Sequence, residues 1–391
     1  MTGKRRVAVT GIGVVSPAGC GQEAFWEGLL SPQPEGERRI HDFDANDYYD
    51  DPKEIRRADR FEHFSVASAQ EALAEAGPLD ADRERIGVIV GTGIGGAQTH
   101  ENQTLVLEAK GSRRVSPFTV PMMMANAGAA AISIAHGFQG PCECLSTACA
   151  SGTHGIGQAV RWIQWGICDV AIAGGAEAGM TPVALSAFAR MKALSPTGVS
   201  RPFDESRDGF VIAEGAAMFV LEEYERARAR GAKILGEVLG SASLADAHHI
   251  TAPAPGGEGA RRCMRTAVED ADLAIEDIVH INAHGTSTPL NDAAEAQGIS
   301  ELFGQPGPIV TSTKGVLGHA LGAAGALEAA AVLLSMKHGI IPPTDGLEQV
   351  DPALPPIDLV QKEPRPWTPG PSLSNSFGFG GHNGTLVIAP S

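Results

Sequence analysis

Short runs of β-branched and other apolar residues alternate with longer segments of helical periodicity, and this alternation limits the fold more than any other feature of the chain. In the first half it predicts strands, bounded by glycine-rich turns, at 6–10, 86–90, 142–146 and 169–173. The second half repeats the rhythm, with predicted strands at 234–239, 279–283, 309–312, 373–376 and 385–388. Strands that alternate with helices favour an α/β fold.

The repeated rhythm also predicts a chain built from two related halves. A charged helical segment at 222–233 separates the two series of strands, and the Ala-rich segment 321–337 is typical of a buried helix. We therefore expect an N-terminal half at 1–232 and a C-terminal half at 233–391. A chain of 391 residues with 43% hydrophobic content is large enough to bury the core of such a unit.

The charge balance excludes several classes of function. Lys and Arg total 30 against 46 Asp and Glu, a net charge of -16, which disfavours binding to nucleic acid or to an anionic membrane. No charge-free apolar stretch reaches the ~18 residues of a membrane span. Six cysteines without a C-x-x-C pair indicate reduced thiols. We expect a cytoplasmic protein without nucleic-acid or membrane partners.

Cys149 is the first candidate for chemistry. It lies in the motif S-T-A-C-A-S-G, where a predicted strand runs into small residues and then into a helix patterned by Ile156, Val160 and Ile163. A thiol at a helix N-terminus feels the positive end of the helix dipole, which stabilises the thiolate, and small neighbours leave room for a substrate carbonyl. A free cysteine is nevertheless more often a small buried apolar residue. Cys149 alone does not establish a nucleophile.

Three further motifs follow predicted strands of the second half. His284 begins H-G-T-S-T-P, Lys314 and His319 lie in T-K-x-x-x-G-H, and residues 375–383 form a glycine-rich loop. Functional sites of α/β sheets gather at the carboxyl ends of strands, and the N–H groups of a glycine-rich loop could face an oxyanion. With Cys149 these motifs supply a thiol, two imidazoles, an ammonium group and oxyanion donors at equivalent strand ends.

The four motifs T-A-C-A-S-G, H-G-T-S-T-P, T-K-x-x-x-G-H and N-S-F-G-F-G-G occur in this order over nearly the whole chain. In this the sequence resembles the elongating β-ketoacyl-[acyl carrier protein] synthases of type II in the thiolase superfamily, which include the ketosynthase subunits of type II polyketide synthases. The resemblance implies an α/β, thiolase-like fold, a duplicated five-layered αβαβα arrangement that dimerises.

The resemblance also implies a reaction and the residues that carry it. Cys149 would take an acyl chain from carrier-protein phosphopantetheine, while the backbone N–H groups of Cys149 and Phe379 stabilise the oxyanion. A malonyl thioester would then lose carbon dioxide, and His284 and His319 would donate hydrogen bonds to the resulting enolate. Attack on the acyl-Cys149 carbonyl would release a β-ketoacyl product longer by two carbons, for fatty acid or polyketide biosynthesis.

Supporting residues follow from the same match. Lys314 would set the charge around the two histidines, and Glu328 could pair with it, because an unpaired buried ammonium group costs several kcal/mol. Phe379 matches the family's gatekeeper beside the cysteine. The positions expected to contact substrate are Ile94 in the acyl tunnel, Thr286 and Thr288 on the pantetheine arm, and Phe377 in the glycine-rich loop.

Partners and cofactors are implied as well. The acyl carrier protein is acidic, so a chain of net charge -16 needs a local basic patch to attract it. The positions that coincide with the family's docking residues are Lys53, Arg56, Arg57, Arg113, Arg114 and Arg201. We expect no cofactor beyond the phosphopantetheine of the carrier protein and no metal. The partner subunit is either an identical copy or a paralogue that resembles a chain-length factor.

Two comparisons within the superfamily favour an elongating enzyme. Thiolases use a second cysteine late in the chain, and none follows Cys263; initiating synthases pair the cysteine with one His and one Asn, whereas His284 and His319 are both present. The segment between Leu30 and Asp42 is shorter than that of the family by roughly a hairpin, a difference that loops tolerate easily. The active subunit of a polyketide heterodimer therefore remains an alternative.

A nicotinamide-dependent oxidoreductase is a remote alternative. Residues 91–96 fit G-x-G-x-x-G after a predicted strand, the pattern of a dinucleotide-binding loop. The motif is weak by itself, and no second strand clearly ends in an acidic residue ~20 positions later. The same loop has a place in the condensing-enzyme interpretation, because it contains Ile94.

Overall fold

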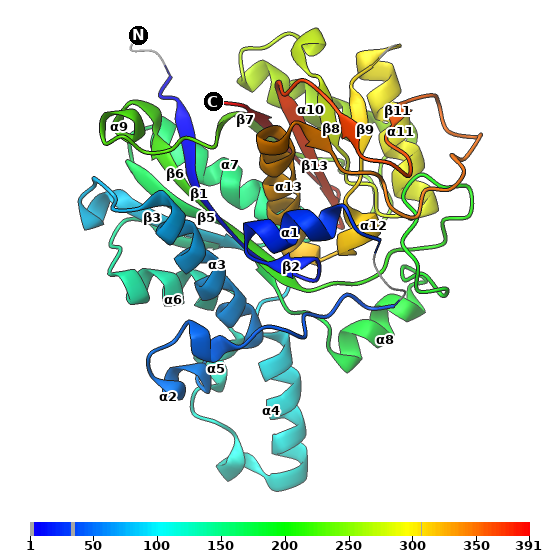
Figure 1. Cartoon of the computed structure of the whole chain (residues 1–391). Coiled ribbons are helices and arrows are strands. Elements are labelled where there is room, and N and C mark those ends of the chain that lie inside the picture. Colours follow the sequence, from blue (N-terminus) through cyan, green and yellow to red (C-terminus); the bar gives the residue numbers. More distant parts are fainter. Residues whose placement is uncertain (1–3, 33–35, 306) are drawn as a thin grey trace.

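The computed structural model describes residues 4–32, 36–305 and 307–391 (Figure 1). Residues 33–35 of the short segment after Leu30 lie outside this description. Five strands of the first half lie in the order β4-β3-β5-β6-β1, with β4 and β5 parallel to β3 and the other two antiparallel to their neighbours. Their bounds are β1 Val7–Ser16, β3 Ile86–Gly91, β4 Cys142–Leu145, β5 Val170–Glu177 and β6 Gly215–Glu223.

The second half repeats this topology. Its strands lie in the order β9-β8-β13-β14-β7, again with three parallel strands followed by two antiparallel ones. The bounds are β7 Gly236–Ala245, β8 His280–Asn282, β9 Ile309–Thr311, β13 Ser372–Gly378 and β14 His382–Ala389. A short antiparallel pairing of β1 with β7 joins the two sheets. The fold is therefore a duplication; the boundary between 232 and 233 stays a prediction.

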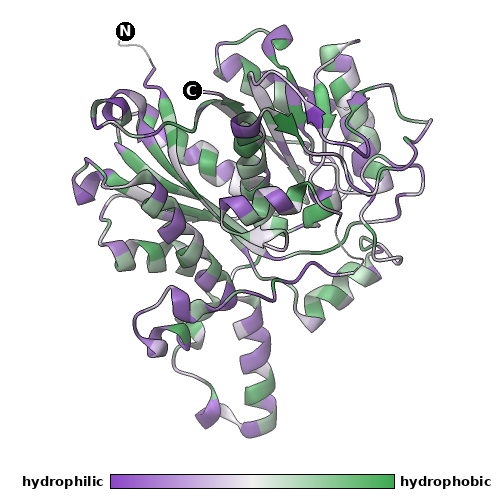
Figure 2. Cartoon of the chain, in the orientation of Figure 1, coloured by the Kyte–Doolittle hydropathy of each residue, from purple (hydrophilic) through white to green (hydrophobic). Residues whose placement is uncertain are grey.

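Helices complete the layers on both sides of each sheet. Outside the first sheet lie α3 (Arg60–Ala76) and α6 (Ala127–His136), and outside the second lie α10 (Glu258–Asp270) and α11 (Pro289–Phe303). Between the sheets, α7 (Ser151–Gln164) packs against α13 (Ala324–His338) in the largest apolar core (Figure 2). This succession of helices and sheets is the expected five-layered thiolase-like fold.

Small residues permit the close packing of the central layer. A Cβ atom on Gly152 in α7 would lie 3.0 Å from the carbonyl oxygen of Gly322 and 3.0 Å from the amide nitrogen of Ala326. Every residue of α13 from Ala324 to Met336 is buried, as the Ala-rich pattern predicted. The helix starts later than predicted, since Leu321–Ala323 forms a 3-10 turn.

The remaining elements are shorter or lie at the periphery. The helices are α1 Gln22–Leu29, α2 Pro52–Ile55, α4 Ala97–Lys110, α5 Thr119–Met123, α8 Pro182–Arg190, α9 Tyr224–Ala229 and α12 Lys314–Leu317. The strands are β2 Gly19–Cys20, β10 Ile340–Ile341, β11 Asp358–Leu359 and β12 Arg365–Pro366. Helix α4 projects from the body of the molecule, with α2 and α5 near its base (Figure 1).

Two predictions of local structure were wrong. Strand β1 continues to Ser16 instead of ending at residue 10, because Gly11 and Gly13 are not turn residues: a Cβ on Gly11 would lie 2.0 Å from the carbonyl oxygen of Ala72 in α3. The central strand β6 was not predicted, although all but its last residue are buried. Within the described residues, no helix is long and apolar enough to cross a bilayer.

Candidate active site

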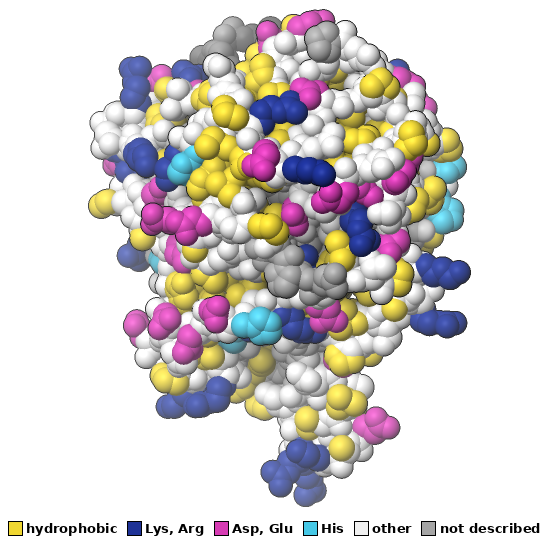
Figure 3. Space-filling view, turned by 45° about the vertical axis from the view of Figure 1, so that its right-hand side comes forward, with side chains coloured by type: hydrophobic (Ala, Val, Ile, Leu, Met, Phe, Trp, Pro, Cys, Tyr) yellow, Lys and Arg dark blue, Asp and Glu magenta, His cyan; other side chains and the backbone are white. Residues whose placement is uncertain are grey.

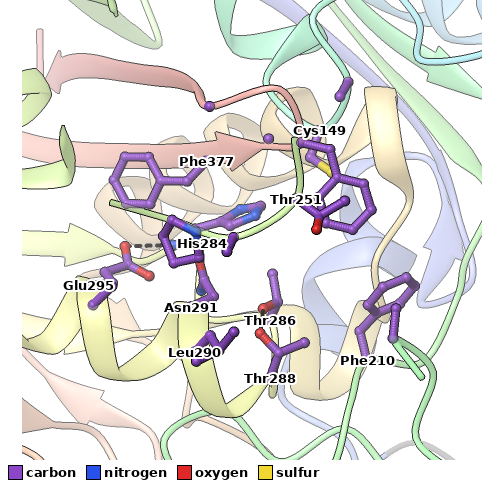
Figure 4. Close-up of a pocket in the computed structure, with 18 of the residues that line it drawn as sticks. Cys149, Phe210, Thr251, His284, Thr286, Thr288, Leu290, Asn291, Glu295 and Phe377 are labelled. Carbon is purple, nitrogen blue, oxygen red and sulfur yellow. Dashed lines mark hydrogen bonds between the residues drawn. The ribbon is translucent and has the colours of Figure 1, made fainter. Parts of the chain in front are cut away.

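The ends of four strands meet at one cavity of about 460 Å³. The loop after β4 brings Cys149, the loop after β8 brings His284, the loop after β9 brings His319, and the end of β13 brings Phe377. Figure 4 shows Cys149, His284 and Phe377 together, with Thr286 and Thr288 farther along the cavity wall. The duplicated topology thus places the thiol of one half opposite the imidazoles of the other.

A sharp turn presents Cys149 at the start of α7. Ala148 adopts a left-handed conformation, with φ of 51°, and the helix begins at Ser151. Gly378 lies against this turn, since a Cβ there would lie 3.0 Å from the Cys149 nitrogen and 2.9 Å from the Thr147 oxygen. The backbone N–H groups of Phe379 and Cys149 face the thiol and favour its charged form. These are the two donors that the sequence predicted for an oxyanion.

The thiol and an imidazole are in direct contact. Sγ of Cys149 lies 3.1 Å from Nε2 of His319, and both side chains are buried. Burial raises the pKa of Cys149 to about 11, although the charge of Lys314 partly opposes this. Burial, together with Lys314, also holds the pKa of His319 well below its ordinary value. The sequence predicted a stabilised thiolate; burial instead favours a neutral thiol beside a neutral imidazole.

Lys314 fixes the orientation of His284. Its ammonium group donates to the carboxylate of Glu328, to the carbonyl oxygen of His284 at 2.6 Å and to Nδ1 of the same residue at 3.2 Å. Three acceptors match the three protons of an ammonium group. Since Nδ1 accepts, the proton of the neutral imidazole lies on Nε2. The pKa of His284 lies well below its ordinary value because of burial and the charge of Lys314.

Glu295 is a buried residue of the site that the sequence analysis missed. Its carboxylate accepts the backbone N–H groups of His284 and Gly285, each at 2.8 Å (Figure 4). Asn375 donates to the same carboxylate at 3.1 Å. Glu295 therefore holds the loop that carries His284. Its position on α11, eleven residues after His284, gave no motif in the sequence.

The residues predicted to contact substrate all line the cavity. They are Ile94, Thr286, Thr288 and Phe377, and Phe379 lines it as well. The hydroxyl groups of Thr286 and Thr288 lie 2.9 Å apart, and the ring of Phe377 packs edge-on against His284. Lys314 and Glu328 do not line the cavity, because they are buried behind the histidines.

Glu177, at the end of β5, is a second buried carboxylate that was missed. It accepts the backbone N–H groups of Gly93 at 2.7 Å and Ile94 at 3.3 Å, and that of Gly322, from the other half, at 3.0 Å. The carboxylate thus occupies the loop whose G-x-G-x-x-G pattern resembled a dinucleotide site. Those N–H groups are not free for a pyrophosphate, which argues against an oxidoreductase.

A loop after β7 closes over the glycine-rich loop and was also missed. The N–H of Asp246 donates to the Gly381 oxygen at 2.9 Å, and the N–H of Gly380 donates to the Ile250 oxygen at 2.7 Å. Asn383 donates to the Asp246 carboxylate at 2.6 Å. Asp246 and Thr251 line the cavity. Only a run of small and polar residues marks this loop in the sequence.

The predicted docking residues fall in two places. Lys53, Arg56 and Arg57 are exposed on and after α2, and Arg113 and Arg114 are exposed beyond the end of α4. The guanidinium of Arg57 stacks on Phe118, 4.5 Å from the ring centroid, which ties the α2 region to the base of α5. We call the projecting part of the molecule that α2, α4 and α5 form the lobe (Figure 1). Figure 3 shows Lys and Arg side chains gathered at its tip.

Arg201 lies apart from that lobe. Its backbone N–H donates to the hydroxyl of Ser287 at 2.8 Å, and its side chain donates to Thr197 at 3.0 Å. Arg201 is therefore adjacent to the loop of Thr286 and Thr288, which line the cavity. The other five predicted docking residues lie on the lobe, whereas Arg201 lies beside the cavity mouth.

Two groups of atoms have the chemistry of metal ligands. Ligand atoms of Cys149, His284 and His319 lie within 4.8 Å of one another, but one thiol–imidazole pair already forms a hydrogen bond there. Behind them, Asn282 and Ser374 face each other on β8 and β13, and both carry a buried side-chain oxygen without a partner among the described residues. One oxygen of Glu328 shares this property. These oxygens could hold a cation; the absence of a metal stays a prediction.

Comparisons with known proteins agree with this geometry. Residues 33–227 match the family described as "Beta-ketoacyl synthase, N-terminal domain", and residues 235–348 match its C-terminal domain. The 3-oxoacyl-[acyl-carrier-protein] synthase 2 of Synechocystis sp. is 44% identical, over 98% of each chain. The protein of the same name from Vibrio harveyi is 42% identical, also over 98% of each.

Solved structures give the same result at the level of the fold. The ishigamide ketosynthase/chain length factor matches with a TM-score of 0.93 at 32% identity, over the whole of both chains. A type II PKS acyl-carrier protein in complex with its ketosynthase bound to the hexaketide matches with a TM-score of 0.89 at 28% identity, again over the whole of both chains.

Proposed function

Because the chain belongs to the beta-ketoacyl synthase family, we propose that it is a β-ketoacyl-[acyl carrier protein] synthase that extends an acyl chain by two carbons. The observation that carries this proposal is the buried cluster of one thiol and two neutral imidazoles at the floor of a single cavity. The reaction has two half-reactions, acyl transfer and condensation, and each uses different members of this cluster.

The first half-reaction is acyl transfer to Cys149. The thiol proton has an acceptor in Nε2 of His319 at 3.1 Å, so the sulfur becomes nucleophilic as it attacks the thioester carbonyl. The N–H groups of Cys149 and Phe379 stabilise the tetrahedral oxyanion. Collapse breaks the carbon–sulfur bond of the donor, and the departing pantetheine thiolate takes the proton back from His319.

The second half-reaction is decarboxylative condensation. Loss of carbon dioxide from the malonyl thioester leaves an enolate, whose oxygen needs hydrogen-bond donors. His284 offers its Nε2 proton, because Lys314 occupies Nδ1. The enolate carbon attacks the acyl-Cys149 carbonyl, the carbon–sulfur bond to Cys149 breaks, and one proton from solvent restores the thiol. Neutral imidazoles suit this step, since they can donate without protonating the enolate carbon.

The partners follow from the relatives. Substrates would arrive on the phosphopantetheine of an acyl carrier protein, whose acidic surface fits the exposed arginines of the lobe. The chain would work as a dimer, with a copy of itself or with a chain-length-factor-like paralogue, in fatty acid or type II polyketide biosynthesis. No cofactor is needed for the steps described.

Intact-protein mass spectrometry tests the proposal. The purified chain is mixed with acyl carrier proteins of graded chain length, and malonyl carrier protein is then added. We expect a mass increase of one acyl group on Cys149, followed by a β-keto product with two more carbons. The variants Cys149→Ala and Cys168→Ala form a matched pair, because both thiols are buried but only Cys149 lines the cavity. Acylation of C149A would contradict the proposal.

A further inference from the structure

The two oxyanion donors of the site belong to segments that are far apart in the chain. The N–H of Cys149 lies in the turn at residues 147–150, before α7, and the N–H of Phe379 lies in the loop between β13 and β14. A donor stabilises an oxyanion only when it lies about 2.7–3.1 Å from the charged oxygen. The turn and the loop must therefore be held at a fixed separation if both donors are to act together.

His154, near the start of α7, joins these two segments. The residue is buried, with 6% of its surface exposed. Its Nδ1 lies 2.8 Å from the hydroxyl oxygen of Thr147, two residues before Cys149. Its Nε2 lies 3.1 Å from the backbone carbonyl oxygen of Asn383, four residues after Phe379. One imidazole ring thus links the turn that carries one donor to the strand that follows the other.

The partners of the ring determine where its proton lies. A backbone carbonyl oxygen can only accept, so Nε2 of His154 carries the proton and donates to Asn383. In the neutral ring Nδ1 is then an acceptor, and the hydroxyl of Thr147 donates to it. Burial holds the pKa of His154 below its ordinary value, which favours this neutral form. Both ring nitrogens are satisfied, in contrast to those of His280, which have no partner among the described residues.

Close packing restricts the same part of α7. A Cβ on Gly384, in β14, would lie 2.9 Å from Nε2 of His154, so the ring lies directly against that strand. The neighbouring residue Thr153 forms a second link, since its hydroxyl oxygen lies 2.7 Å from that of Ser376 in β13. The first turn of α7 is therefore bonded to both strands that flank the glycine-rich loop.

We infer that His154 is a positioning residue for acyl transfer, which holds the two oxyanion donors at the separation that the tetrahedral intermediate requires. His154 does not line the cavity, so it acts through the two segments that it joins. This inference rests on the proposed function, because the oxyanion forms only when Cys149 attacks a carbonyl group.

Two reactions of Cys149 distinguish a positioning role from a structural one. With p-nitrophenyl hexanoate the sulfur attacks the ester carbonyl, an oxyanion forms, and p-nitrophenolate leaves. With iodoacetamide the sulfur displaces iodide from a saturated carbon, and no oxyanion forms. In both reactions the thiol proton passes to solvent. Because a change in the exposure or ionisation of the thiol alters both rates, the ratio of acylation to alkylation reports on the oxyanion site.

Two conservative variants each keep one of the two links. His154→Gln places an amide N–H near the position of Nε2 and keeps the donor to Asn383, whereas His154→Asn places an amide oxygen near Nδ1 and keeps only the acceptor for Thr147. A misplacement of about 1 Å can cost about 100-fold in rate. We expect the ratio of acylation to alkylation to fall at least about tenfold in H154N and about threefold or less in H154Q. An unchanged ratio in H154N would overturn the inference.

His280→Gln is the matched control, because His280 is a buried histidine of β8 that does not line the cavity. Thermal denaturation measures the stability that each variant loses. H280Q should lose stability without a change in the ratio. If it lowered the ratio as much as H154N, the loss of a buried histidine would account for both results, and the inference would be overturned.

Extension by malonyl carrier protein, measured on the same variants, separates this inference from the proposed function. A wild-type chain that reacts with the ester but is never extended would contradict the condensing enzyme, while the ratio in H154N would still test the link. Normal extension with an unchanged ratio in H154N would contradict the link alone.

Discussion

Gly378 lies so close to Cys149 that a methyl group on Gly378 would clash with it: a Cβ atom there would lie 3.0 Å from the Cys149 nitrogen. The contact joins the last strands of the second half to the nucleophile turn of the first. It also brings the N–H of Phe379 to the thiol. The geometry of the oxyanion site therefore depends on a residue that has no side chain.

Substitution of Gly378 by Ala should displace the Phe379 amide. Removal of one oxyanion donor typically costs about 100-fold or more in rate, so we expect acylation and condensation both to fall by about that factor. Thermal denaturation would show that the variant still folds. A wild-type acylation rate would mean that the Phe379 amide does not stabilise the transition state.

Lys314→Met should separate the two half-reactions. The substitution removes the donor to Nδ1 of His284 and leaves Glu328 buried without its partner, at a cost of about 3 kcal/mol or more in stability. We expect condensation to fall more than acylation, because only the enolate step uses the His284 proton. The double variant K314M/E328L should recover stability without recovering condensation. Equal losses in both half-reactions would contradict this assignment.

Glu177→Gln should change the acyl chain-length preference. A glutamine keeps a single acceptor oxygen, so its NH2 group replaces one of the two carboxylate oxygens that accept the N–H groups of Gly93, Ile94 and Gly322, and this should destabilise the fold by about 2 kcal/mol. The loop that carries Ile94 would then shift in the cavity wall. We expect the ratio of kcat/KM between short and long acyl donors to change at least about fivefold, and an unchanged ratio would limit Glu177 to a structural role.

Alkylation of Cys149 should depend steeply on pH. Its pKa is raised to about 11, and iodoacetamide reacts with the thiolate, so the rate should rise about tenfold per pH unit between pH 7 and 10. K314M should slow the reaction at each pH, because Lys314 lowers this pKa. Peptide-resolved mass spectrometry distinguishes Cys149 from the exposed Cys142. A plateau already at pH 7 would indicate a preformed thiolate–imidazolium pair.

Charge reversal on the lobe should weaken binding of the carrier protein and leave the chemical steps unchanged. The double variant Arg56→Glu/Arg57→Glu should raise KM for acyl carrier protein by about tenfold at low salt, with kcat unchanged and the effect reduced at high salt. Arg265→Glu, on the exposed surface of α10, is the matched control. An unchanged KM would place the docking surface elsewhere, and Arg201 beside the cavity mouth would be the next residue to test.

The motifs predicted the groups that meet substrate but not those that hold them. Cys149, His284 and His319 each follow a strand within a distinctive local pattern, so the sequence sufficed to bring them to one site. Glu177 accepts backbone N–H groups from Gly93 and Gly322, 84 and 145 residues away, and Glu295 accepts those of the His284 loop from the helix that follows it. One carboxylate among the 46 acidic residues carries no local signal. Only tertiary packing identifies these two, within the second half for Glu295 and between the halves for Glu177.

Strand β6 and the ionisation of the thiol were misjudged for a related reason. The segment of β6, G-A-A-M-F-V-L-E-E, places a short apolar run between small residues and two glutamates, and its strand character comes from its place between β1 and β5. The helix dipole acts locally and could be read from the sequence, whereas the burial that raises the pKa of Cys149 depends on residues of both halves. Tertiary context decided both outcomes.

The division of the reacting groups between two halves has a consequence for synthesis of the chain. His319 follows Cys149 by 170 residues, so the nucleophile is synthesised roughly 10 to 30 s before its imidazole exists, at 5–20 residues per second. During that interval the thiol has neither its proton acceptor nor the walls that bury it. The nascent first half therefore carries an unprotected cysteine that cannot yet catalyse, and reactivity begins only when the last strands close the second sheet.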